Sequence, residues 1–550
     1  MSQTDDEILA IARSYLAEDP DADTRVELQG LLDPPDLPEL RDRLGRRLEF
    51  GTAGLRGALG AGLNRMNRVV VQQTAAGLAR YLLDSGHEGG AVVIGYDARH
   101  KSDVFALDTA EIIAGAGLRP LLFDGHVPTP VVAFAIRALG AVAGVVVTAS
   151  HNPPADNGYK VYLGDGSQIV PPADADISAA IDGVGPLADI PRAVVDDRIG
   201  AEVIDAYAER LGALMAEIGT ATTADRAALR VVYTPLHGVG GTLLRRCLVD
   251  AGFAEPVVVA EQADPDPDFP TVPFPNPEEK GAIDAAVALA RTVDADLVIA
   301  NDPDADRCAV AVPDLDGWRM LTGDEVGVLL GRRLLAARPE GMFAASIVSS
   351  GMLGALATRQ GARYTETLTG FKWIARVPDL AFGYEEALGY CTDPAAVRDK
   401  DGISAALVLA DLAAAAKAAG RSVVADLVEA ARELGVHATG QVSARFDDAD
   451  RLPAVMADLR RQPPRSLGQW QIVRVDDLAD GSADMPPTDG LRFVLAGGHR
   501  VTIRPSGTEP KVKGYLEVVL PVTAGDPVAG RRTAAGHLSE LGAEVLALLV

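Results

Sequence analysis

Short apolar runs that end in polar or glycine residues recur along most of this 550-residue chain. Examples are AVVIGYDAR at 91–99, VVVTASH at 145–151 and ADLVIANDPDADR at 295–307, and stretches that are apolar at helical spacing, such as 281–293, lie between such runs. Runs of this kind are typical of buried strands, and their alternation with helices predicts an α/β fold with largely parallel sheets. Ligands bind such sheets outside the carboxyl ends of the strands, so chemistry is expected at the polar ends of the runs.

The chain is too long for one hydrophobic core, and we expect four domains. The first three are expected to be similar α/β domains with mixed, largely parallel sheets, and beyond about residue 441 the pattern changes to a smaller α+β domain. The first 45 residues are expected to form a helical cap. The expected domains are 1–200, 201–316, 317–438 and 439–550, with linkers at 182–200, around 313–318 and near 435–440.

Charge and composition exclude several classes of protein. The formal net charge of −26 argues against a general partner of nucleic acids or acidic membranes, and an anionic substrate would need local cationic groups. No apolar run approaches the roughly 18–20 residues that span a bilayer. The three cysteines form no CxxC pair and the first 20 residues are acidic and amphipathic, as expected of a cytoplasmic protein.

The segment DPDADR carries three carboxylates directly after an apolar run. Asp302, Asp304 and Asp306 alternate, so an extended loop would point all three to one side, and such oxygen ligands suit a hard divalent cation. An EF-hand is excluded because its sixth position is Arg307 instead of glycine and its twelfth is Pro313 instead of glutamate. The alternative, a solvated acidic loop, is disfavoured because three unneutralised carboxylates at a strand end would repel one another.

Two further segments, GTAGLRG at 51–57 and RPSGTEPK at 504–511, combine glycine, hydroxyl groups and an arginine. Glycine lets backbone N–H groups approach an anion, and the guanidinium groups of Arg56 and Arg504 could bind phosphate through two parallel hydrogen bonds. Neither segment contains the nucleotide-binding pattern GxxxxGK[ST]. A glycine turn with a surface arginine is the alternative for each segment, and the pair predicts two anion sites or one site shared by distant domains.

The segment TASHNPP places Ser150 and His151 at the end of an apolar run, and Lys160 follows ten residues later. No GxSxG pattern surrounds the serine, and a serine at a strand end is more often structural than catalytic. Only 8 of the 51 basic residues are lysines, so a lysine within a motif is less easily explained as a surface residue. A phosphorylated serine would supply a fourth ligand to a cation held by DPDADR, as phosphoryl transfer requires.

The segment GYEEALGY places Glu385 and Glu386 in a glycine-flanked turn. Paired carboxylates suit the hydroxyl groups of a sugar, and an acidic pair at a helix N-terminus is the alternative. In TLTGFKWI, Lys372 lies beside a glycine turn and is a candidate contact to an anion or a sugar. Lys400 precedes an expected helix start and is interpreted as structural.

Together these motifs resemble those of the α-D-phosphohexomutase superfamily, which contains the phosphoglucomutases and phosphomannomutases. TASHNPP resembles its phosphoserine loop, DPDADR its magnesium loop, GYEEALGY its sugar-recognition loop and RPSGTEPK its phosphate-binding loop. The motifs occur in the family's order over roughly residues 50 to 515. GTAGLRG, GFKWI and GYEEALGY look most like the phosphoglucomutase-2 and phosphopentomutase branch.

The resemblance implies four domains around a central cleft and a Ser150 that is phosphorylated in the resting enzyme. It implies that the three aspartates hold Mg²⁺ together with the serine phosphate, and that Lys160 transfers a proton or steadies the substrate oxygen. The residues implied around the transferring phosphoryl group are Arg56, His151, Lys160 and Arg307. Those implied to bind the sugar or its non-reacting phosphate are Lys372, Glu385, Glu386, Arg504, Ser506, Gly507 and Thr508.

The implied reaction moves a phosphoryl group between the 1- and 6-positions of glucose or mannose through a phosphoserine and a sugar bisphosphate, with glucose 1,6-bisphosphate as activator. Relative to the family's GEMSGH and GEESGH loops, aligned on Glu386, this chain has Leu388 for the serine and Tyr390 for the histidine, which leaves the sugar open. The alternatives are a phosphopentomutase, a glucose 1,6-bisphosphate synthase, a phosphatase and a regulator that only binds sugar phosphates. We expect a monomer or homodimer with a phosphosugar as its partner, and neither nucleic acid nor membrane.

Overall fold

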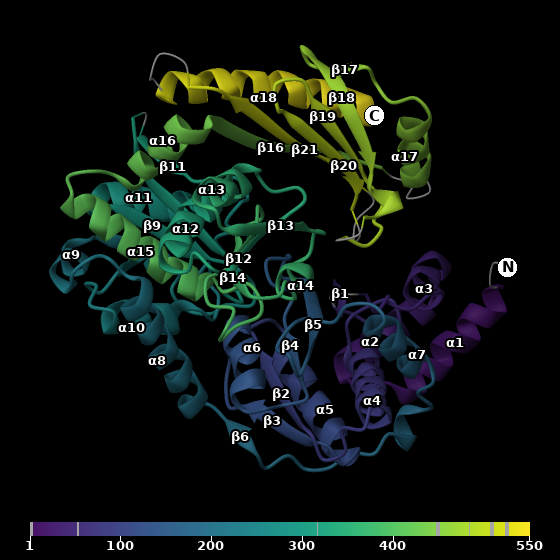
Figure 1. Cartoon of the computed structure of the whole chain (residues 1–550). Helices are drawn as coiled ribbons and strands as arrows, with labels where there is room; N and C mark the ends of the chain where they lie inside the picture. Colours follow the sequence, from purple (N-terminus) through teal and green to yellow (C-terminus); the bar gives the residue numbers. More distant parts are fainter. Residues whose placement is uncertain are drawn as a thin grey trace. The chain divides into compact units, whose positions relative to one another are not determined.

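The computed structural model describes residues 4–51, 54–315, 317–446, 451–482, 485–506, 511–522 and 527–550 (Figure 1). The predicted site residues Gly507 and Thr508 lie outside these ranges. The chain divides into two compact units. The first unit comprises Met1–Met320 and Gly389–Ala419, and the second unit comprises Leu321–Leu388 and Gly420–Val550.

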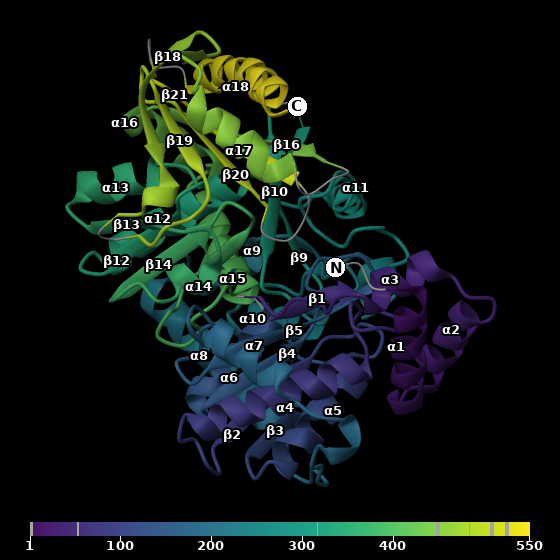
Figure 2. The ribbon, with the colours of Figure 1, turned by 90° about the vertical axis from the view of Figure 1, so that its right-hand side faces the viewer.

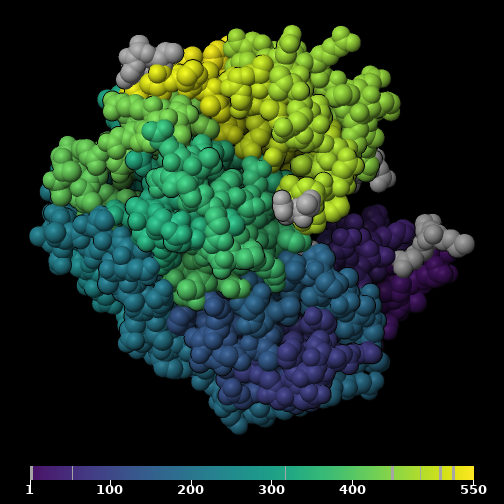
Figure 3. Space-filling view, in the orientation of Figure 1, coloured from purple at the N-terminus to yellow at the C-terminus, as the bar shows by residue number. Residues whose placement is uncertain are grey.

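The first unit begins with a helical cap, as expected for the first 45 residues. Thr4 and Glu7 form a capping box that fixes the start of the first helix, because each side chain accepts a hydrogen bond from the other residue's backbone N–H. The three helices pack around Ile8, Leu28 and Leu40, and Figures 2 and 3 show them gathered at the surface of this unit. They are α1 (Asp5–Glu18), α2 (Ala22–Leu32) and α3 (Leu37–Leu44).

A six-stranded sheet follows, in the order β1-β5-β4-β2-β3-β6. Strands β4, β2, β3 and β6 are parallel to one another, and β5 and β1 continue the sheet antiparallel. Its apolar strands are buried on both faces, which explains their continuous valine and isoleucine runs. The elements are β1 (Leu55–Ala58), α4 (Arg68–Asp84), β2 (Ala91–Tyr96), α5 (Ser102–Gly115), β3 (Arg119–Phe123), α6 (Thr129–Ala138), β4 (Ala143–Val147), β5 (Asp156–Leu163), α7 (Ala173–Asp182) and β6 (Arg198–Ile199).

The second sheet of this unit has the order β11-β10-β9-β7-β8. Strands β9, β7 and β8 are parallel, and β10 and β11 are antiparallel to their neighbours. Helix α15 (Gly402–Ala418) packs against this sheet and is buried along most of its length. The other elements are α8 (Ala201–Ile218), α9 (Thr223–Ala228), β7 (Val231–Thr234), α10 (Gly241–Asp250), β8 (Val257–Val258), α11 (Asp284–Thr292), β9 (Leu297–Asn301), β10 (Cys308–Asp314), β11 (Gly317–Met320) and β15 (Gly389–Cys391).

The second unit contains parallel strands in the order β13-β12-β14 and a separate antiparallel sheet in the order β16-β21-β20-β19-β18-β17. Helix α18 lies along one face of the antiparallel sheet (Figure 1). The elements are α12 (Gly323–Ala337), β12 (Met342–Ser346), α13 (Met352–Gln360), β13 (Arg363–Thr367), α14 (Phe371–Ile374), β14 (Leu380–Glu385), α16 (Val423–Leu434), β16 (Val436–Arg445), α17 (Arg451–Arg461), β17 (Ser466–Leu467), β18 (Trp470–Asp477), β19 (Leu491–Leu495), β20 (Arg500–Pro505), β21 (Lys511–Leu520) and α18 (Pro527–Leu549).

The predicted fold class is confirmed: three sheets with parallel strands are followed by a smaller α+β domain with an antiparallel sheet. Two of the predicted linkers contain regular secondary structure. In the segment around 313–318, strand β10 ends at Asp314 and its antiparallel partner β11 begins at Gly317; in the segment near 435–440, the long strand β16 begins at Val436. Their proline and glycine residues therefore mark a hairpin and a strand start.

Among the described helices, none is by itself long and apolar enough to cross a membrane, and one bent pair, α15 with α16, passes this test by length and composition only.

Candidate active site

The loop after β4 holds Ser150 in an unusual backbone conformation. Its φ angle is +52°, which non-glycine residues adopt only where the surrounding contacts impose it. The backbone N–H of Ser150 donates to Thr148 Oγ1 at 2.8 Å, and Thr148 donates to Asp97 Oδ2 at 2.6 Å. Ser150 is buried, with 2% of its surface exposed. The strand end therefore presents the hydroxyl in one fixed orientation.

The guanidinium group of Arg99 binds the backbone carbonyls of this loop. Arg99 donates to the carbonyl oxygens of Ser150 and Asn152, each at 2.6 Å, and to those of Pro153 and Asp156 at 2.8 and 3.1 Å. Five donors in a rigid plane make arginine suited to such a role. Arg99 was not identified from the sequence as a site residue. Its only signal was the polar end of the run AVVIGYDAR, which was interpreted as a strand end.

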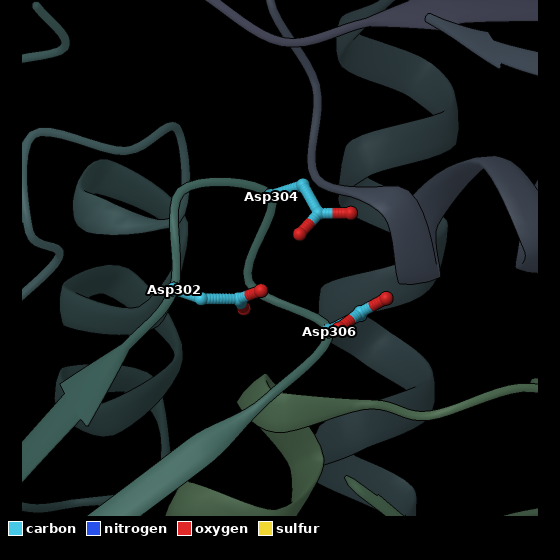
Figure 4. A group of neighbouring side chains, drawn as sticks. All are labelled: Asp302, Asp304 and Asp306. Carbon is cyan, nitrogen blue, oxygen red and sulfur yellow. The ribbon is translucent and has the colours of Figure 1, made fainter. Parts of the chain in front are cut away.

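The three aspartates of DPDADR lie together after β9. Their carboxylate oxygens lie within 4.8 Å of one another, and Figure 4 shows them on one side of the loop. The loop is a tight turn instead of the extended segment that we predicted. Ala305 has a φ of +56°, and its N–H donates to the carbonyl of Asp302 at 2.9 Å. The turn, and not the alternation of an extended chain, brings the carboxylates together.

The donor set of this turn fits a hard divalent cation. Burial and the neighbouring charges of Asp304 and Asp306 raise the pKa of Asp302 well above its usual value. Asp304 Oδ1 and Asp306 Oδ1 are buried and have no hydrogen-bond partner among the residues that the structure describes. Buried oxygens without partners are costly, and a cation would satisfy them.

Ser150 and Lys160 both contact the aspartate turn. Ser150 Oγ donates to Asp302 Oδ2 at 2.6 Å. Lys160, on β5, places its Nζ 2.7 Å from Asp304 Oδ2 and 2.8 Å from Asp306 Oδ2. Burial lowers the pKa of Lys160, but the two carboxylates outweigh this effect and raise it above its usual value. The lysine is therefore an ammonium cation at neutral pH.

A second buried lysine joins the same group. Lys400 Nζ lies 2.9 Å from Asp306 Oδ2, and the next residue, Asp401, caps the N-terminus of α15. The predicted helix start is correct, but the interpretation of Lys400 as only structural missed its place beside the carboxylates. Scarcity of lysine, the signal that favoured Lys160, applied equally to Lys400.

Three other predicted residues lie near Ser150 and the aspartates in the first unit. His151 Nδ1 lies 3.1 Å from Ser150 Oγ, and burial together with the nearby Arg307 and Arg56 lowers the pKa of His151 well below its usual value. Arg56, on β1, donates to Asn152 Oδ1 at 3.1 Å. The backbone N–H of Arg307 donates to Asp302 Oδ1 at 3.0 Å, and its Nε lies 3.9 Å from Asp306 Oδ1.

The predicted sugar-binding residues lie in the second unit. Glu385 ends β14 and accepts a hydrogen bond from the N–H of Gly370 at 2.6 Å, and Lys372 lies in the short helix α14. Glu386 Oε2 accepts hydrogen bonds from the hydroxyls of Ser346 and Ser349, both at 2.9 Å. The two glutamates occupy a strand end and a turn, so the alternative of a helix N-terminus is wrong.

The two departures of GYEEALGY from the family loop are buried residues. Leu388 and Tyr390 are both fully buried in the structure. Leu388 has a φ of +62° at the end of the turn. Their side chains therefore contribute to packing, and neither one is exposed to bind a ligand.

One of the predicted phosphate-binding residues lies on the antiparallel sheet and another directly follows its strand β20. Arg504 is on β20 opposite Lys513 of β21, and the N–H of Ser506 donates to the carbonyl of Lys511 at 2.8 Å. Burial and the carboxylates of Glu386 and Glu385 raise the pKa of Tyr515, and Arg504 opposes this shift. The charges of Glu385, Glu386 and Arg504 therefore act on Tyr515 within the second unit.

The fold, together with a buried carboxylate triad that could hold a metal ion, points to the class of phosphotransfer enzymes. Four matches cover the chain in order. They are phosphoglucomutase/phosphomannomutase alpha/beta/alpha domain I over residues 47–185, domain II over 205–317, domain III over 322–431 and the C-terminal domain over 442–524. The chain belongs to the phosphoglucomutase/phosphomannomutase family within the α-D-phosphohexomutase superfamily, and it is an isomerase of the phosphomutase type.

Individual relatives carry different names. The chain is 48% identical to a "probable phosphomannomutase" of Haemophilus influenzae over 82% of this chain and 93% of that protein. It is 36% identical to a human phosphopentomutase over 89% of this chain and 88% of that protein. A phosphoglucomutase/phosphomannomutase family protein of Burkholderia thailandensis has the same fold, with a TM-score of 0.69, 20% identity and coverage of 90% and 96%.

Proposed function

We propose that this chain is a Mg²⁺-dependent phosphosugar mutase that works through a phosphorylated Ser150. The observation that carries the proposal is the hydroxyl of Ser150, held 2.6 Å from a buried triad of carboxylates in a chain of the phosphomutase family. Asp302, Asp304 and Asp306 would hold the cation. When bound, Mg²⁺ would neutralise the charge that develops on the transferred group.

The neighbouring residues have separate tasks in the proposed reaction. The phosphorus–oxygen bond to Ser150 breaks as a phosphorus–oxygen bond to the substrate hydroxyl forms. The proton of that hydroxyl passes to Ser150 Oγ, which regains its hydroxyl group. His151, whose Nδ1 lies 3.1 Å from this oxygen and whose lowered pKa keeps it neutral, relays the proton. Lys160 is already protonated between two carboxylates, so it steadies the reacting oxygens instead of accepting a proton. Arg56, Arg307 and Lys400 add positive charge.

The substrate is proposed to be a hexose phosphate, glucose or mannose, whose bisphosphate intermediate turns end for end and returns a phosphoryl group to Ser150. Glu385, Glu386 and Lys372 are proposed to bind the sugar, and Arg504, Ser506, Gly507 and Thr508 the phosphate that does not react. Glucose 1,6-bisphosphate would phosphorylate Ser150 at the outset. The 48% identity to a protein named phosphomannomutase supports a hexose.

The second candidate is a phosphopentomutase that acts on ribose or deoxyribose 1-phosphate. Its support is the 36% identity to a human protein of that name over 89% of this chain. Leu388 is apolar and Tyr390 is buried, so neither position presents an exposed polar group that would select a hexose.

The test is a side-by-side assay of glucose, mannose and ribose 1-phosphates with Mg²⁺ and a catalytic amount of glucose 1,6-bisphosphate. We expect isomerisation of at least one hexose phosphate and loss of activity on chelation of the metal. Faster turnover of the pentose would replace the hexose assignment by the second candidate. Release of free phosphate without isomerisation would make the chain a phosphatase and refute the mutase.

Ser150→Ala tests the covalent step directly. We expect turnover to fall by roughly a thousandfold or more, because the variant has no oxygen to carry the phosphoryl group. Intact mass spectrometry after incubation with glucose 1,6-bisphosphate should show one added phosphate on the parent protein and none on the variant. Ser85→Ala, at an exposed position after α4, is the control and should retain both the turnover and the added phosphate of the parent protein. A Ser150→Ala enzyme with parent activity would remove the serine from this role.

A further inference from the structure

A largely buried ion-pair network in the second unit, with partly exposed members around a buried Glu517, joins the antiparallel sheet to the segment SIVSSG, residues 346–351, which we call the serine loop. The charged members are Glu517 on β21, Arg500 on β20, Arg492 on β19 and Glu366 on β13. None of these residues was identified from the sequence, and the proposed reaction does not use them. The network contains two negative and two positive side chains, so its charge is balanced.

Glu517 is the member with the most contacts to the serine loop. Its Oε1 accepts hydrogen bonds from Ser350 Oγ at 2.7 Å and from the N–H of Gly351 at 2.8 Å. The same oxygen lies 2.9 Å from His437 Nδ1, and Oε2 lies 2.9 Å from Arg500 Nη2. Glu517 is 5% exposed. A buried carboxylate with this many donors is held rigidly and holds its partners in turn.

The two arginines hold the rest of the serine loop. Arg500 donates to the carbonyl of Ser349, and Arg492 donates to the carbonyl of Ile347 at 3.1 Å. Glu366 pairs with both guanidinium groups, each at 2.9 Å. The antiparallel sheet thus contacts the loop at Ile347, Ser349, Ser350 and Gly351.

The serine loop in turn holds Glu386, the proposed sugar-binding carboxylate. Ser346 and Ser349 donate to Oε2 of Glu386, and the N–H of Glu386 donates to Ser349 Oγ at 3.1 Å. Oε1 of Glu386 has no hydrogen-bond partner within the described part of the chain and is available to a ligand. Arg504, proposed to bind the non-reacting phosphate, is four residues after Arg500 on the same strand.

We propose that Glu517 is a positioning residue that fixes Glu386, through the serine loop, relative to Arg504 and so determines how well the sugar and its non-reacting phosphate are bound together. This inference rests on the proposed function. In physical terms, a sugar phosphate bound at two points by rigidly connected groups loses less binding free energy to reorganisation than one bound by independent groups.

Glu517→Gln is the main test, because the amide keeps the shape and removes the charge that faces Arg500. We expect KM for the preferred sugar phosphate to rise by about tenfold, as for residues coupled in one hydrogen-bond network, with kcat changed less than threefold. Hydrogen exchange should become faster in peptides that cover 346–351 and 383–388. Mg²⁺ affinity should not change. The matched control is Asp477→Asn, on β18 of the same sheet, which breaks a partly exposed pair with Arg460 of α17. This variant should alter neither KM nor exchange in these peptides.

The outcomes separate this inference from the proposed function. If the parent protein isomerises no sugar phosphate, the proposed function fails regardless of Glu517. If the parent is active and Glu517→Gln has the parent's KM, the positioning role is refuted, whatever the exchange data show. Should Glu517→Gln fail to fold, Arg500→Lys replaces it, because lysine retains the charge but cannot contact Glu366, Glu517 and Ser349 together. An unchanged KM in that variant would also refute the proposal.

Discussion

Glu517 and Asp324 are buried carboxyl groups whose pKa values move in opposite directions. Burial raises the pKa of Glu517, but the hydrogen bond from His437 and the charge of Arg500 prevail and lower it to about 2. Burial raises the pKa of Asp324 to about 6, although the N–H of Ser350 opposes the shift. The difference follows from the partners: Glu517 faces a guanidinium group, whereas Asp324 accepts hydrogen bonds from the neutral donors of Ser350, Tyr384 and Thr439.

The lowered pKa of Glu517 predicts a pH-dependent contribution to stability. A carboxyl group with a lowered pKa in the folded state stabilises the fold above its unfolded pKa, near 4.5, and this contribution is lost as the pH falls toward 2. The difference in unfolding free energy between the parent and Glu517→Gln should therefore be constant from pH 7 to 5. Below pH 4.5 it should shrink by about 1.4 kcal/mol per pH unit. Urea denaturation at several pH values measures this difference, and one that stays constant down to pH 3.5 would contradict the assignment.

Arg99 is the second residue with a testable role, which is to hold the loop that carries Ser150. Arg99→Lys keeps the charge, but one ammonium group cannot reach the four carbonyls that the guanidinium group contacts. We expect phosphorylation of Ser150 by glucose 1,6-bisphosphate to slow by about 100-fold, the effect of a misplacement near 1 Å at a reacting group. Time-resolved intact mass measures this rate. The control is Arg192→Lys, which alters a more exposed pair with Asp108 and Glu111. In this variant Ser150 should be phosphorylated at the parent rate.

At the scale of elements, the N-terminus of α10 packs directly against the aspartate turn. The N–H of Val239 donates to the carbonyl of Pro303 at 2.8 Å. A Cβ atom on Gly238 would lie 2.4 Å from Pro303 Cα, and one on Gly240 would lie 2.7 Å from Ala305 Cβ. These distances are shorter than any normal contact. The two glycines therefore allow the close approach that sets the position of the turn.

Gly238→Ala should displace the aspartate turn and weaken metal binding. Because the clash is with backbone, the turn must move, and we expect Mg²⁺ affinity measured by calorimetry to fall about tenfold or more. Gly212→Ala in α8 is the control, since a Cβ atom there meets nothing within 4 Å. That control should bind Mg²⁺ normally and be more stable by about 0.5–1 kcal/mol. Parent affinity in Gly238→Ala would show that the turn does not depend on this contact.

In the whole molecule, the first unit is assembled from two separate segments of the chain. Helix α15 contributes to its core, and Gly402 lies so close to the aspartate turn that a Cβ atom there would be 2.2 Å from the carbonyl oxygen of Arg307. Residues 389–419 also form buried or partly buried pairs with the preceding segment: Tyr207 with Asp401, Arg210 with Asp393 and Arg226 with Asp411.

This assembly predicts that residues 1–320 do not fold stably alone. Without residues 389–419 the carboxyl partners of Arg210 and Arg226 are missing and the apolar surface that α15 covers is exposed, a loss that a marginally stable domain does not tolerate. We expect the fragment to show a broad thermal transition by circular dichroism, and its co-expression with a peptide of residues 389–419 to restore a cooperative one. A cooperative transition in the fragment alone would refute this dependence.

Much of the fold could be predicted because the signals are local. Apolar runs and helical spacing located β2, β4, β9 and α11, and the change of pattern near residue 441 indicated a different C-terminal domain. The predicted linkers around 313–318 and near 435–440 contain a hairpin and a strand start, because these features share their proline- and glycine-rich composition with linkers. The matched family domains nevertheless end and begin near both segments, at 317 and 322 and at 431 and 442. The predicted domain boundaries and the roles of individual site residues stay predictions.

The sequence by itself determined the order of the elements, the serine at the end of β4 and the carboxylates of DPDADR, because each depends on residues close together in the chain. Only the tertiary structure brought Arg99 to the carbonyl oxygen of Ser150, Lys400 to the carboxylate of Asp306 and Glu517 to the serine loop. These pairs are 51, 94 and 167 residues apart, and their contacts arise from the packing of distant elements. A pattern of neighbouring residues does not encode such packing, and it likewise could not reveal that Leu388 is buried.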